Sequence, residues 1–223
     1  MKLIEYPDRE MMMIDLANQL AGELNGALMN PPHASFAVPG GSTPGPVFDT
    51  LSAADLHWDR IHVMLTDERW VPEDSDRSNT RLVRERLLTN RAAMAQYVPL
   101  CAETGTPEEA IDDLAAGLAP ELPISVLLLG MGADGHIASL FPGADRLADA
   151  LDDRAPPLMA MRAPGAPEPR VTLTAPVLAG AMSTHILITG AEKRETLERA
   201  RHAKRDEMPV RVVWNDAIVH WAE

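Results

Sequence analysis

The segment LGMGADGHIASLFPG, residues 129–143, carries a histidine and a carboxylate within a run of glycines. Histidine is suited to act as a general base at neutral pH, because its unperturbed pKa lies near ~6.5. We therefore interpret the glycines as shaping a loop that presents His136 and Asp134 in a cleft. The alternative is a structural histidine, which is the more common role for any one of the seven in this chain.

Three of these glycines, Gly130, Gly132 and Gly135, also match G-x-G-x-x-G, the pattern of loops that bind dinucleotides. That pattern requires a full helix after its third glycine. Here Pro142 follows Gly135 after only six residues, which is too short for such a helix. The sequence therefore disfavours an NAD-dependent dehydrogenase, and we expect no cofactor.

A second segment, VPGGSTP at residues 38–44, lies between an expected strand and an expected helix. Its glycines, including Gly41, let the backbone approach a ligand closely, and Ser42 and Thr43 offer hydroxyl groups. Free N–H groups at the start of a helix attract anions. The segment lacks the lysine of a Walker A loop. It predicts either an anion site or a tight turn that needs glycine.

Acidic and basic side chains meet in a third segment, TDERWVP at residues 66–72. Asp67 and Arg69 follow an expected strand, at the end where open α/β sheets bind ligands. They could hold hydroxyl groups and an anion together, or they could form a surface ion-pair cluster. Further along the chain, Arg170 and Lys193 could each donate a charge-assisted hydrogen bond to a phosphate. The alternative for each is a solvated surface cation.

The overall composition limits the possible partners. A formal net charge of −13 disfavours nucleic acid and anionic membranes, because polyanions are bound mainly by cationic side chains. The single cysteine, Cys101, excludes an intrachain disulfide framework and a zinc site built on several cysteines. The other histidines show no metal-ligand spacing, so we predict no metal. Neither a secretory signal nor a membrane-spanning apolar run is evident, and we expect a cytoplasmic protein.

Short apolar runs alternate with helical stretches between these motifs. Because the runs are continuously apolar, they indicate strands covered on both faces, as in a mostly parallel sheet. This alternation predicts an α/β fold with helices on both faces. The expected strands are 35–38, 61–65, 97–100, 125–129, 171–173, 185–188 and 210–214, and the expected helices are 8–29, 44–54, 79–88, 107–118, 175–181 and 192–203.

Local signals refine this picture. Thr106, Pro107 and Glu109 predict a capping box at the start of a helix, and Ser78 predicts a helix cap. The proline-rich stretch 154–169 is interpreted as a long surface loop, with elements of the same alternating pattern on either side. We therefore expect one domain over residues 1–223.

Six motifs in order resemble the family of 6-phosphogluconolactonases and glucosamine-6-phosphate isomerases. They are PGGSTP at 39–44, TDERWVP at 66–72, SN at 78–79, LLGMGADGHIASLFPG at 128–143, RVTLT at 170–174 and GAEK at 190–193. The glycine-rich motif ending in SLFPG is the most specific. The resemblance implies a Rossmann-like fold with three α/β/α layers. It also implies hydrolysis of 6-phospho-D-glucono-1,5-lactone to 6-phosphogluconate, in the oxidative pentose phosphate pathway.

The resemblance also implies roles for matching residues. His136 would be the general base that activates water, and Arg69 would stabilise negative charge on the carbonyl oxygen. Asp134 would orient His136 or bind substrate hydroxyls, and Asp67 could bind hydroxyls too. The 6-phosphate would be held by Gly41, Ser42, Thr43, Arg170 and Lys193. The implied partner is a small sugar phosphate lactone, and the chain would be a monomer or a small homo-oligomer.

One departure and two alternatives accompany this interpretation. Many lactonases carry a Pro-Lys-Pro-type sequence before the RVTLT strand, but APGAP at 163–167 has no lysine, so Arg162 or Arg170 would have to compensate. An isomerase or deaminase of the same family would carry Asn-Glu-Pro after DGHIA, where this chain has SLFP. A non-catalytic sugar-phosphate sensor would tend to lose the histidine and to carry a DNA-binding domain.

Overall fold

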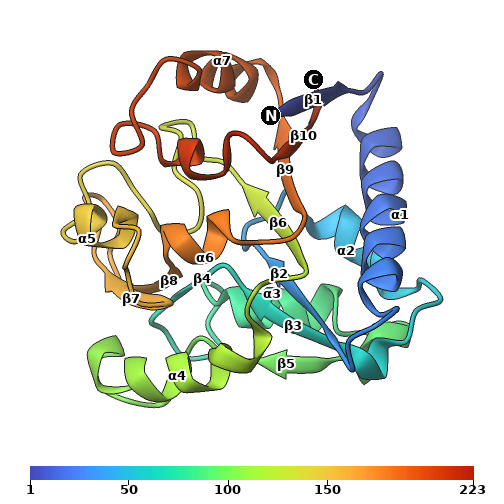
Figure 1. The fold of residues 1–223 in the computed structure, drawn as a ribbon, viewed down its shortest axis with the longest axis horizontal. Helices are drawn as coiled ribbons and strands as arrows, with labels where there is room; N and C mark the ends of the chain where they lie inside the picture. The colour runs from blue at the N-terminus through green and yellow to red at the C-terminus, as the bar shows by residue number, and fades with distance from the viewer.

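A seven-stranded sheet forms the centre of the computed structural model, which describes residues 1–223 (Figure 1). Every neighbouring pair of its strands is parallel. The central strands are almost wholly buried, as expected when both faces of a parallel sheet are covered. In spatial order the strands are β1 (Lys2–Glu5), β10 (Ile218–Ala222), β9 (Thr184–Thr189), β6 (Val126–Gly130), β2 (Ala34–Val38), β3 (Ile61–Leu65) and β5 (Gln96–Val98).

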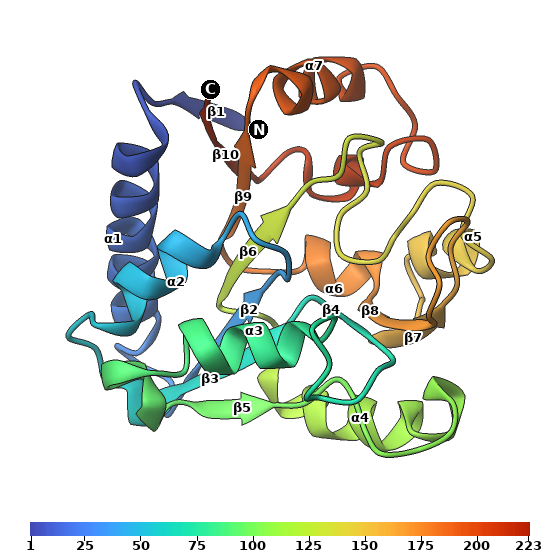
Figure 2. The same cartoon turned by 180° about the vertical axis from the view of Figure 1, so that it is seen from behind.

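Helices cover both faces of this sheet, which confirms the predicted three-layer α/β/α fold. Helices α1 (Arg9–Ala27) and α2 (Gly45–Ser52) lie on one face, and α6 (Ala175–Ala179) lies on the other (Figures 1 and 2). The buried face of α1 is apolar at helical spacing, from Met12 to Leu24. The remaining helices are α3 (Asn79–Arg86), α4 (Ile111–Leu118), α5 (Leu147–Leu151) and α7 (Ala191–Ala200). None of the helices is long and apolar enough to cross a membrane.

A smaller antiparallel sheet packs beside α6, in the order β4 (Asp67–Arg69), β8 (Arg170–Leu173) and β7 (Leu158–Met161). One sequence prediction is therefore wrong here: the stretch 154–169 is not a loop throughout, because β7 lies within it. The predicted strand at 171–173 is confirmed as part of β8, which belongs to this separate sheet. Its pairing places Arg170 opposite Arg69.

Another predicted strand, 210–214, is a short 3-10 helix at Pro209–Val213, and the strand that completes the sheet lies at 218–222. Proline at the start of a helical turn explains the difference, because its fixed backbone angle suits that position. The backbone N–H of Val210 donates to the carbonyl of Gly135 at 2.9 Å, so this turn supports the glycine-rich loop instead of a strand.

The two predicted helix caps have opposite outcomes. Ser78 caps α3 as predicted, since its hydroxyl accepts a hydrogen bond from the backbone of Arg81 at 3.1 Å. The capping box at Thr106 does not form. The Glu109 carboxylate accepts from the backbone of Gly105 at 3.2 Å instead, and the chain makes a 3-10 turn before α4 begins.

The apolar interior is continuous across both sheets. A cluster of 54 buried residues includes Phe36 and Leu65 of the parallel sheet and Met159 and Leu173 of the smaller one. The smaller sheet is therefore packed against the main core, and the residues that it carries are held in place relative to the parallel strands.

Candidate active site

The carboxyl ends of β2, β3, β6 and β9 open into one pocket of about 250 Å³. The strands that follow β2 in the sequence, β3 and β5, lie on one side of it in the sheet. The later strands β6, β9 and β10 lie on its other side. The pocket is thus at the point where the strand order reverses, which is the usual place for a ligand in an open α/β sheet.

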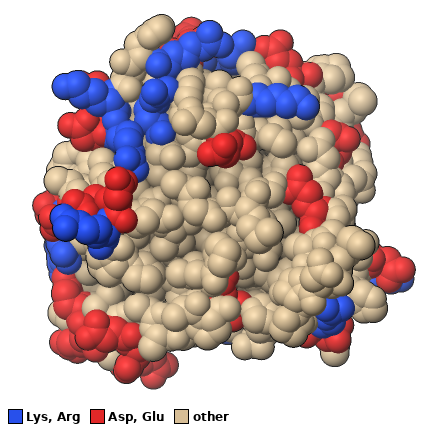
Figure 3. All heavy atoms as spheres, viewed as in Figure 1, with Lys and Arg blue, Asp and Glu red and all other residues tan.

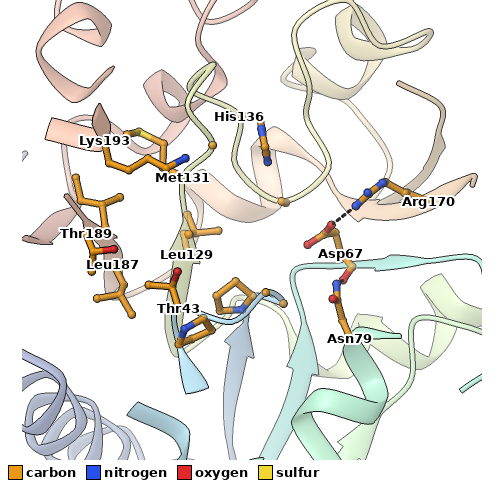
Figure 4. Close-up of a pocket in the computed structure, with 18 of the residues that line it drawn as sticks. Thr43, Asp67, Asn79, Leu129, Met131, His136, Arg170, Leu187, Thr189 and Lys193 are labelled. Atoms are coloured by element: carbon orange, nitrogen blue, oxygen red, sulfur yellow. Dashed lines mark hydrogen bonds and ion pairs between the residues drawn. The ribbon is translucent and has the colours of Figure 1, made fainter. Parts of the chain in front are cut away.

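The structure brings most of the predicted site residues to this pocket. Those that line it are Gly41, Thr43, Asp67, Arg69, His136, Arg170 and Lys193. The other two do not line it. Ser42 is exposed and lines a neighbouring groove, and Asp134 lies behind His136. Residues that are more than 150 positions apart in the sequence therefore share one cavity (Figure 4).

His136 points into the cavity (Figure 4). Asp134 contacts its ring and does not itself line the cavity. Nδ1 of His136 lies 2.6 Å from Oδ1 of Asp134, which also accepts the His136 backbone N–H at 3.1 Å. Partial burial would raise the pKa of Asp134, but these interactions with His136 outweigh it and lower that pKa below its usual range. An ionised Asp134 accepts a hydrogen bond from the protonated Nδ1, which leaves Nε2 with a lone pair that can accept a proton.

The glycine-rich loop has the shape that this pair requires. A Cβ on Gly132 would lie 2.1 Å from Nδ1 of His136, so no other residue fits there without displacing the imidazole. The backbone N–H of Gly132 donates to the carbonyl of His136 at 2.9 Å, which closes the loop. No helix follows Gly135 until α5 begins at Leu147, in agreement with the rejection of a dinucleotide site.

Phe141 links the histidine to the arginine on the other side of the loop. Its ring centroid lies 4.1 Å from that of His136, and the guanidinium carbon of Arg170 lies 5.2 Å from the Phe141 ring centroid. Ser139, from the same loop, donates to Oδ2 of Asp67 at 2.5 Å. The SLFPG motif therefore fixes the side chains around the pocket. This is a physical reason why the motif is the most specific of the six for the family.

Two neighbouring arginines form one side of the pocket. Arg170 Nη1 lies 3.6 Å from Asp67 Oδ2, and Arg69 Nη1 donates to Oδ1 of Asn79 at 3.1 Å. The Nε atoms of both arginines are buried and have no hydrogen-bond partner, although Glu168 lies 3.9 Å from Nε of Arg69. Burial lowers the pKa of Arg170, and the nearby Arg69 lowers it further, although Asp67 opposes both. Unpartnered buried donors and adjacent positive charges make this side of the pocket suited to an anion.

Lys193 approaches the pocket from the side opposite Arg170, together with Thr189 and Thr43 (Figure 4). It lies in the first turn of α7, and α2 begins just after Thr43. Gly41 has a φ of 84°, a left-handed conformation that favours glycine and turns the loop toward α2. Two helix starts and an ammonium group thus converge on this end, which is also suited to an anion.

Positive charge is concentrated near Lys193 although the chain as a whole is acidic. Residues 193–211 contain seven lysines and arginines against four acidic residues. Figure 3 shows Lys and Arg gathered over α7 and the segment that follows it. This local field would attract an anionic ligand to the pocket. Arg162 does not contribute, because it pairs with Glu108 at 2.5 Å and does not line the pocket.

Sequence reasoning missed several residues that shape the site. Asn79 lines the pocket, although the sequence indicated it only as part of a helix cap and of the SN motif, with no role in the site. Glu68 is buried beneath it and accepts the backbone N–H groups of Arg69, Asn79 and Thr80. An acidic residue between two site residues was a signal that could have found Glu68. Ser139 and Phe141 stood in a recognised motif, but nothing local showed what they contact.

Comparisons with known proteins find similar sequences and a similar fold. A model of the family described as glucosamine-6-phosphate isomerases/6-phosphogluconolactonase matches residues 7–221. A 6-phosphogluconolactonase of Rhizobium meliloti is 42% identical over 93% of this chain and 92% of its own length. One from Mesorhizobium japonicum is 40% identical over 97% and 93%. The crystal structure of a 6-phosphogluconolactonase from Shewanella baltica superimposes with a TM-score of 0.95 and 33% identity, covering 100% of this chain and 97% of that one.

Proposed function

Because the chain belongs to the family of glucosamine-6-phosphate isomerases and 6-phosphogluconolactonases, we propose that it hydrolyses 6-phospho-D-glucono-1,5-lactone to 6-phosphogluconate. It is an enzyme of carbohydrate metabolism that opens a lactone. The similar proteins are 6-phosphogluconolactonases, and the match extends over nearly their full length. The observation that carries the mechanism is His136, backed by Asp134 and pointing into a pocket lined by cations.

His136 acts as the general base. Its Nε2 takes a proton from a water molecule, whose oxygen attacks C1 of the lactone and forms a tetrahedral intermediate. The bond between C1 and the ring oxygen then breaks, and the ring oxygen receives the proton from His136. The product is the open-chain 6-phosphogluconate. Asp134 holds the imidazole in the required tautomer and stabilises its positive charge.

The cations and the loop bind the rest of the substrate. Arg69 stabilises the negative charge that develops on the carbonyl oxygen. Asp67 accepts hydrogen bonds from sugar hydroxyls. The 6-phosphate is held by Lys193 and the loop residues Gly41 and Thr43, and by Arg170 from the facing side; Ser42 lines the neighbouring groove and has no contact with the phosphate in this arrangement. Anchoring this remote group fixes the position of C1 relative to the water molecule.

A hydrolysis assay with freshly prepared lactone tests this proposal against the spontaneous rate. We expect acceleration of lactone opening and no conversion of glucosamine 6-phosphate, which the isomerase branch would consume. His136→Ala should lower kcat by roughly 10²–10⁴-fold, the usual contribution of a general base, and should leave binding of 6-phosphogluconate intact. The matched control is His57→Ala, since His57 is exposed and outside the pocket. Unchanged turnover in His136→Ala would remove this histidine from the mechanism.

The cell location and the assembly are further parts of the proposal. A phosphorylated sugar is charged and does not cross membranes readily, which supports a cytoplasmic location. We also propose that the chain has no nucleic-acid partner, which the net charge of −13 supports, and that it is a monomer or a small homo-oligomer. Light scattering on the purified chain measures its mass in solution.

A further inference from the structure

Two histidines and a glutamate meet at the end of the parallel sheet that is opposite to the active site. His33 directly precedes β2, and His62 is the second residue of β3. Glu121 ends the short 3-10 turn that leads toward β6. The three residues come from segments next to the amino ends of three adjacent strands, whereas the active site lies at the carboxyl ends.

The side chains of this cluster are in close contact. Oε1 of Glu121 lies 2.9 Å from Nδ1 of His62, and Oε2 lies 3.2 Å from Nε2 of His33. One nitrogen of each histidine and one oxygen of the glutamate all lie within 4.8 Å of one another. The two imidazole rings are stacked, with centroids 4.1 Å apart and planes 8° from parallel.

Glu121 is unusual because its charged side chain is buried and one of its carboxylate oxygens makes no hydrogen bond. Its side chain is 5% exposed, and Oε2 is buried without a hydrogen bond of acceptable geometry. Nε2 of His33 lies 3.2 Å from this oxygen but makes no hydrogen bond to it, and a buried carboxylate oxygen without a hydrogen bond is energetically unfavourable. Its backbone is also fixed, because Ser35 donates from Oγ to the carbonyl of Glu121 at 2.8 Å. The carboxylate is therefore held between the two imidazoles with an unused lone pair.

We propose that His33, His62 and Glu121 form a binding site for Zn²⁺. Two imidazole nitrogens and a carboxylate oxygen are a ligand set that zinc accepts, at bond lengths of about 2.0–2.2 Å. The free Oε2 of Glu121 supplies the anionic ligand. His33 and His62 are 28% and 16% exposed, so the ion has access from solvent, a ring can rotate, and water can complete the coordination.

This proposal departs from the expectation from sequence that the chain binds no metal. The proposed ligands are 29 and 59 positions apart, a spacing that matches no local metal motif. Only the pairing of β2 with β3 and the position of the turn before β6 bring them together. An ion bound there would join three neighbouring segments, so its expected effect is on the stability of the sheet and not on catalysis.

Zinc titration of the metal-free full-length chain tests the proposal, with calorimetry and thermal unfolding as readouts. His136 and Asp134 could also bind zinc, so all variants are made in a His136→Ala background. We expect one equivalent of Zn²⁺ to bind and to raise Tm. Glu121→Gln and His33→Ala should each weaken that binding at least about tenfold. His57→Ala, an exposed histidine outside the cluster, should leave both affinity and Tm shift unchanged.

Two results would overturn the proposal. One is the absence of binding and of a Tm shift at about 100 µM Zn²⁺, a concentration that would reveal any site of useful affinity. The other is retention of full affinity in His33→Ala. Because His33 is partly exposed, that variant remains informative even where Glu121→Gln does not fold. With Co²⁺ in place of Zn²⁺, visible absorption bands that disappear in His33→Ala would identify the histidine as a ligand.

Discussion

At the scale of single residues, the site depends on charges that are placed behind or beside the reacting groups. Asp134 is half exposed and does not line the pocket, yet it contacts Nδ1 of His136 directly. Its lowered pKa keeps it ionised at neutral pH. Asp134 is therefore a positioning residue in our mechanism, and its effect on catalysis passes through the imidazole.

The variant Asp134→Asn tests this role because it keeps the size of the side chain and removes its charge. An amide can present either its oxygen or its NH₂ group to Nδ1, so the imidazole is no longer restricted to one tautomer. We expect kcat to fall by between about 10-fold and about 10⁴-fold, with little change in the affinity for 6-phosphogluconate. Steady-state kinetics and product binding measure the two effects. An unchanged kcat would show that the carboxylate has no part in orienting the base.

The phosphate contacts are tested by Lys193→Ala and Arg170→Ala. Each variant should raise KM and weaken inhibition by 6-phosphogluconate more than it lowers kcat, because a charge-assisted hydrogen bond to a remote group is lost. Lys204→Ala is the matched control, since Lys204 is exposed and outside the pocket. If inhibition responds to only one of the two variants, the phosphate lies at that end of the pocket. If it responds to neither, the assignment is wrong.

At the scale of elements, the junction of β4 and α3 determines how Arg69 and Asn79 face the pocket. Glu68 is 1% exposed and joins the two elements. Its carboxylate accepts backbone hydrogen bonds from Arg69 at 2.7 Å, Asn79 at 2.9 Å and Thr80 at 2.7 Å, and a further one from the Thr80 hydroxyl at 2.7 Å. The negative charge also lies at the start of α3, where it interacts favourably with the helix dipole.

Glu68→Gln should destabilise this junction. One acceptor oxygen becomes an NH₂ group that faces N–H donors, and the charge at the helix start is lost. We expect the free energy of unfolding to fall by about 2–4 kcal/mol, the range for breaking a buried charged network. Urea unfolding measures the change. Glu73→Gln on the nearby surface is the control, and its exposed ion pair with Arg84 should contribute at most about 1 kcal/mol. Equal stability of the two variants would contradict this role for Glu68.

At the scale of the whole molecule, a buried polar chain connects α1 to the sheet. The Tyr6 hydroxyl contacts Nδ1 of His220 at 2.9 Å, and Nε2 of His220 contacts His185 at 2.9 Å. His185 in turn lies 2.9 Å from Glu23 of α1. Burial, with a further contribution from His185, lowers the pKa of His220 to about 4. The folded protein therefore keeps His220 neutral over most of the acidic range.

This pKa predicts a dependence of stability on pH. The unfolded chain protonates His220 near pH ~6.5 and the folded chain only near pH 4, so between these values the unfolded state binds more protons. The contribution of His220 to stability is complete above pH ~6.5 and is lost as the pH falls toward 4. Its size is about 3 kcal/mol. Urea unfolding between pH 4 and pH 7 measures the slope, which should be smaller in His220→Gln and unchanged in His202→Gln, an exposed histidine.

The continuous core also predicts a single unfolding transition. One cluster of buried apolar residues includes both sheets, so the smaller sheet should not unfold separately. We expect circular dichroism and tryptophan fluorescence to report the same midpoint during urea unfolding at pH 7. Two separate midpoints would contradict our prediction of one domain over residues 1–223.

Local features of the fold could be predicted from the sequence. The apolar runs at β2, β3, β6 and β9, and the helical spacing in α1, indicated a parallel sheet covered by helices. Burial in a helix or strand requires apolar residues at regular spacing along that segment, so these patterns can be recognised in the sequence. The strands and helices that were missed are β1, β4, β7, β10 and α5, each of five residues or fewer. Such short segments carry too few periods for a pattern to emerge.

The sequence by itself determined which side chains we propose for the chemistry of this protein, because His136, Arg69, Arg170 and Lys193 stand in motifs that can be recognised in one dimension. Only the tertiary structure decided how they are arranged. The antiparallel pairing of β4 with β8 places Arg69 opposite Arg170, and the parallel order of β2, β3 and β6 gathers His33, His62 and Glu121. Both groupings come from contacts between segments far apart in the chain, where local spacing carries no information about distance.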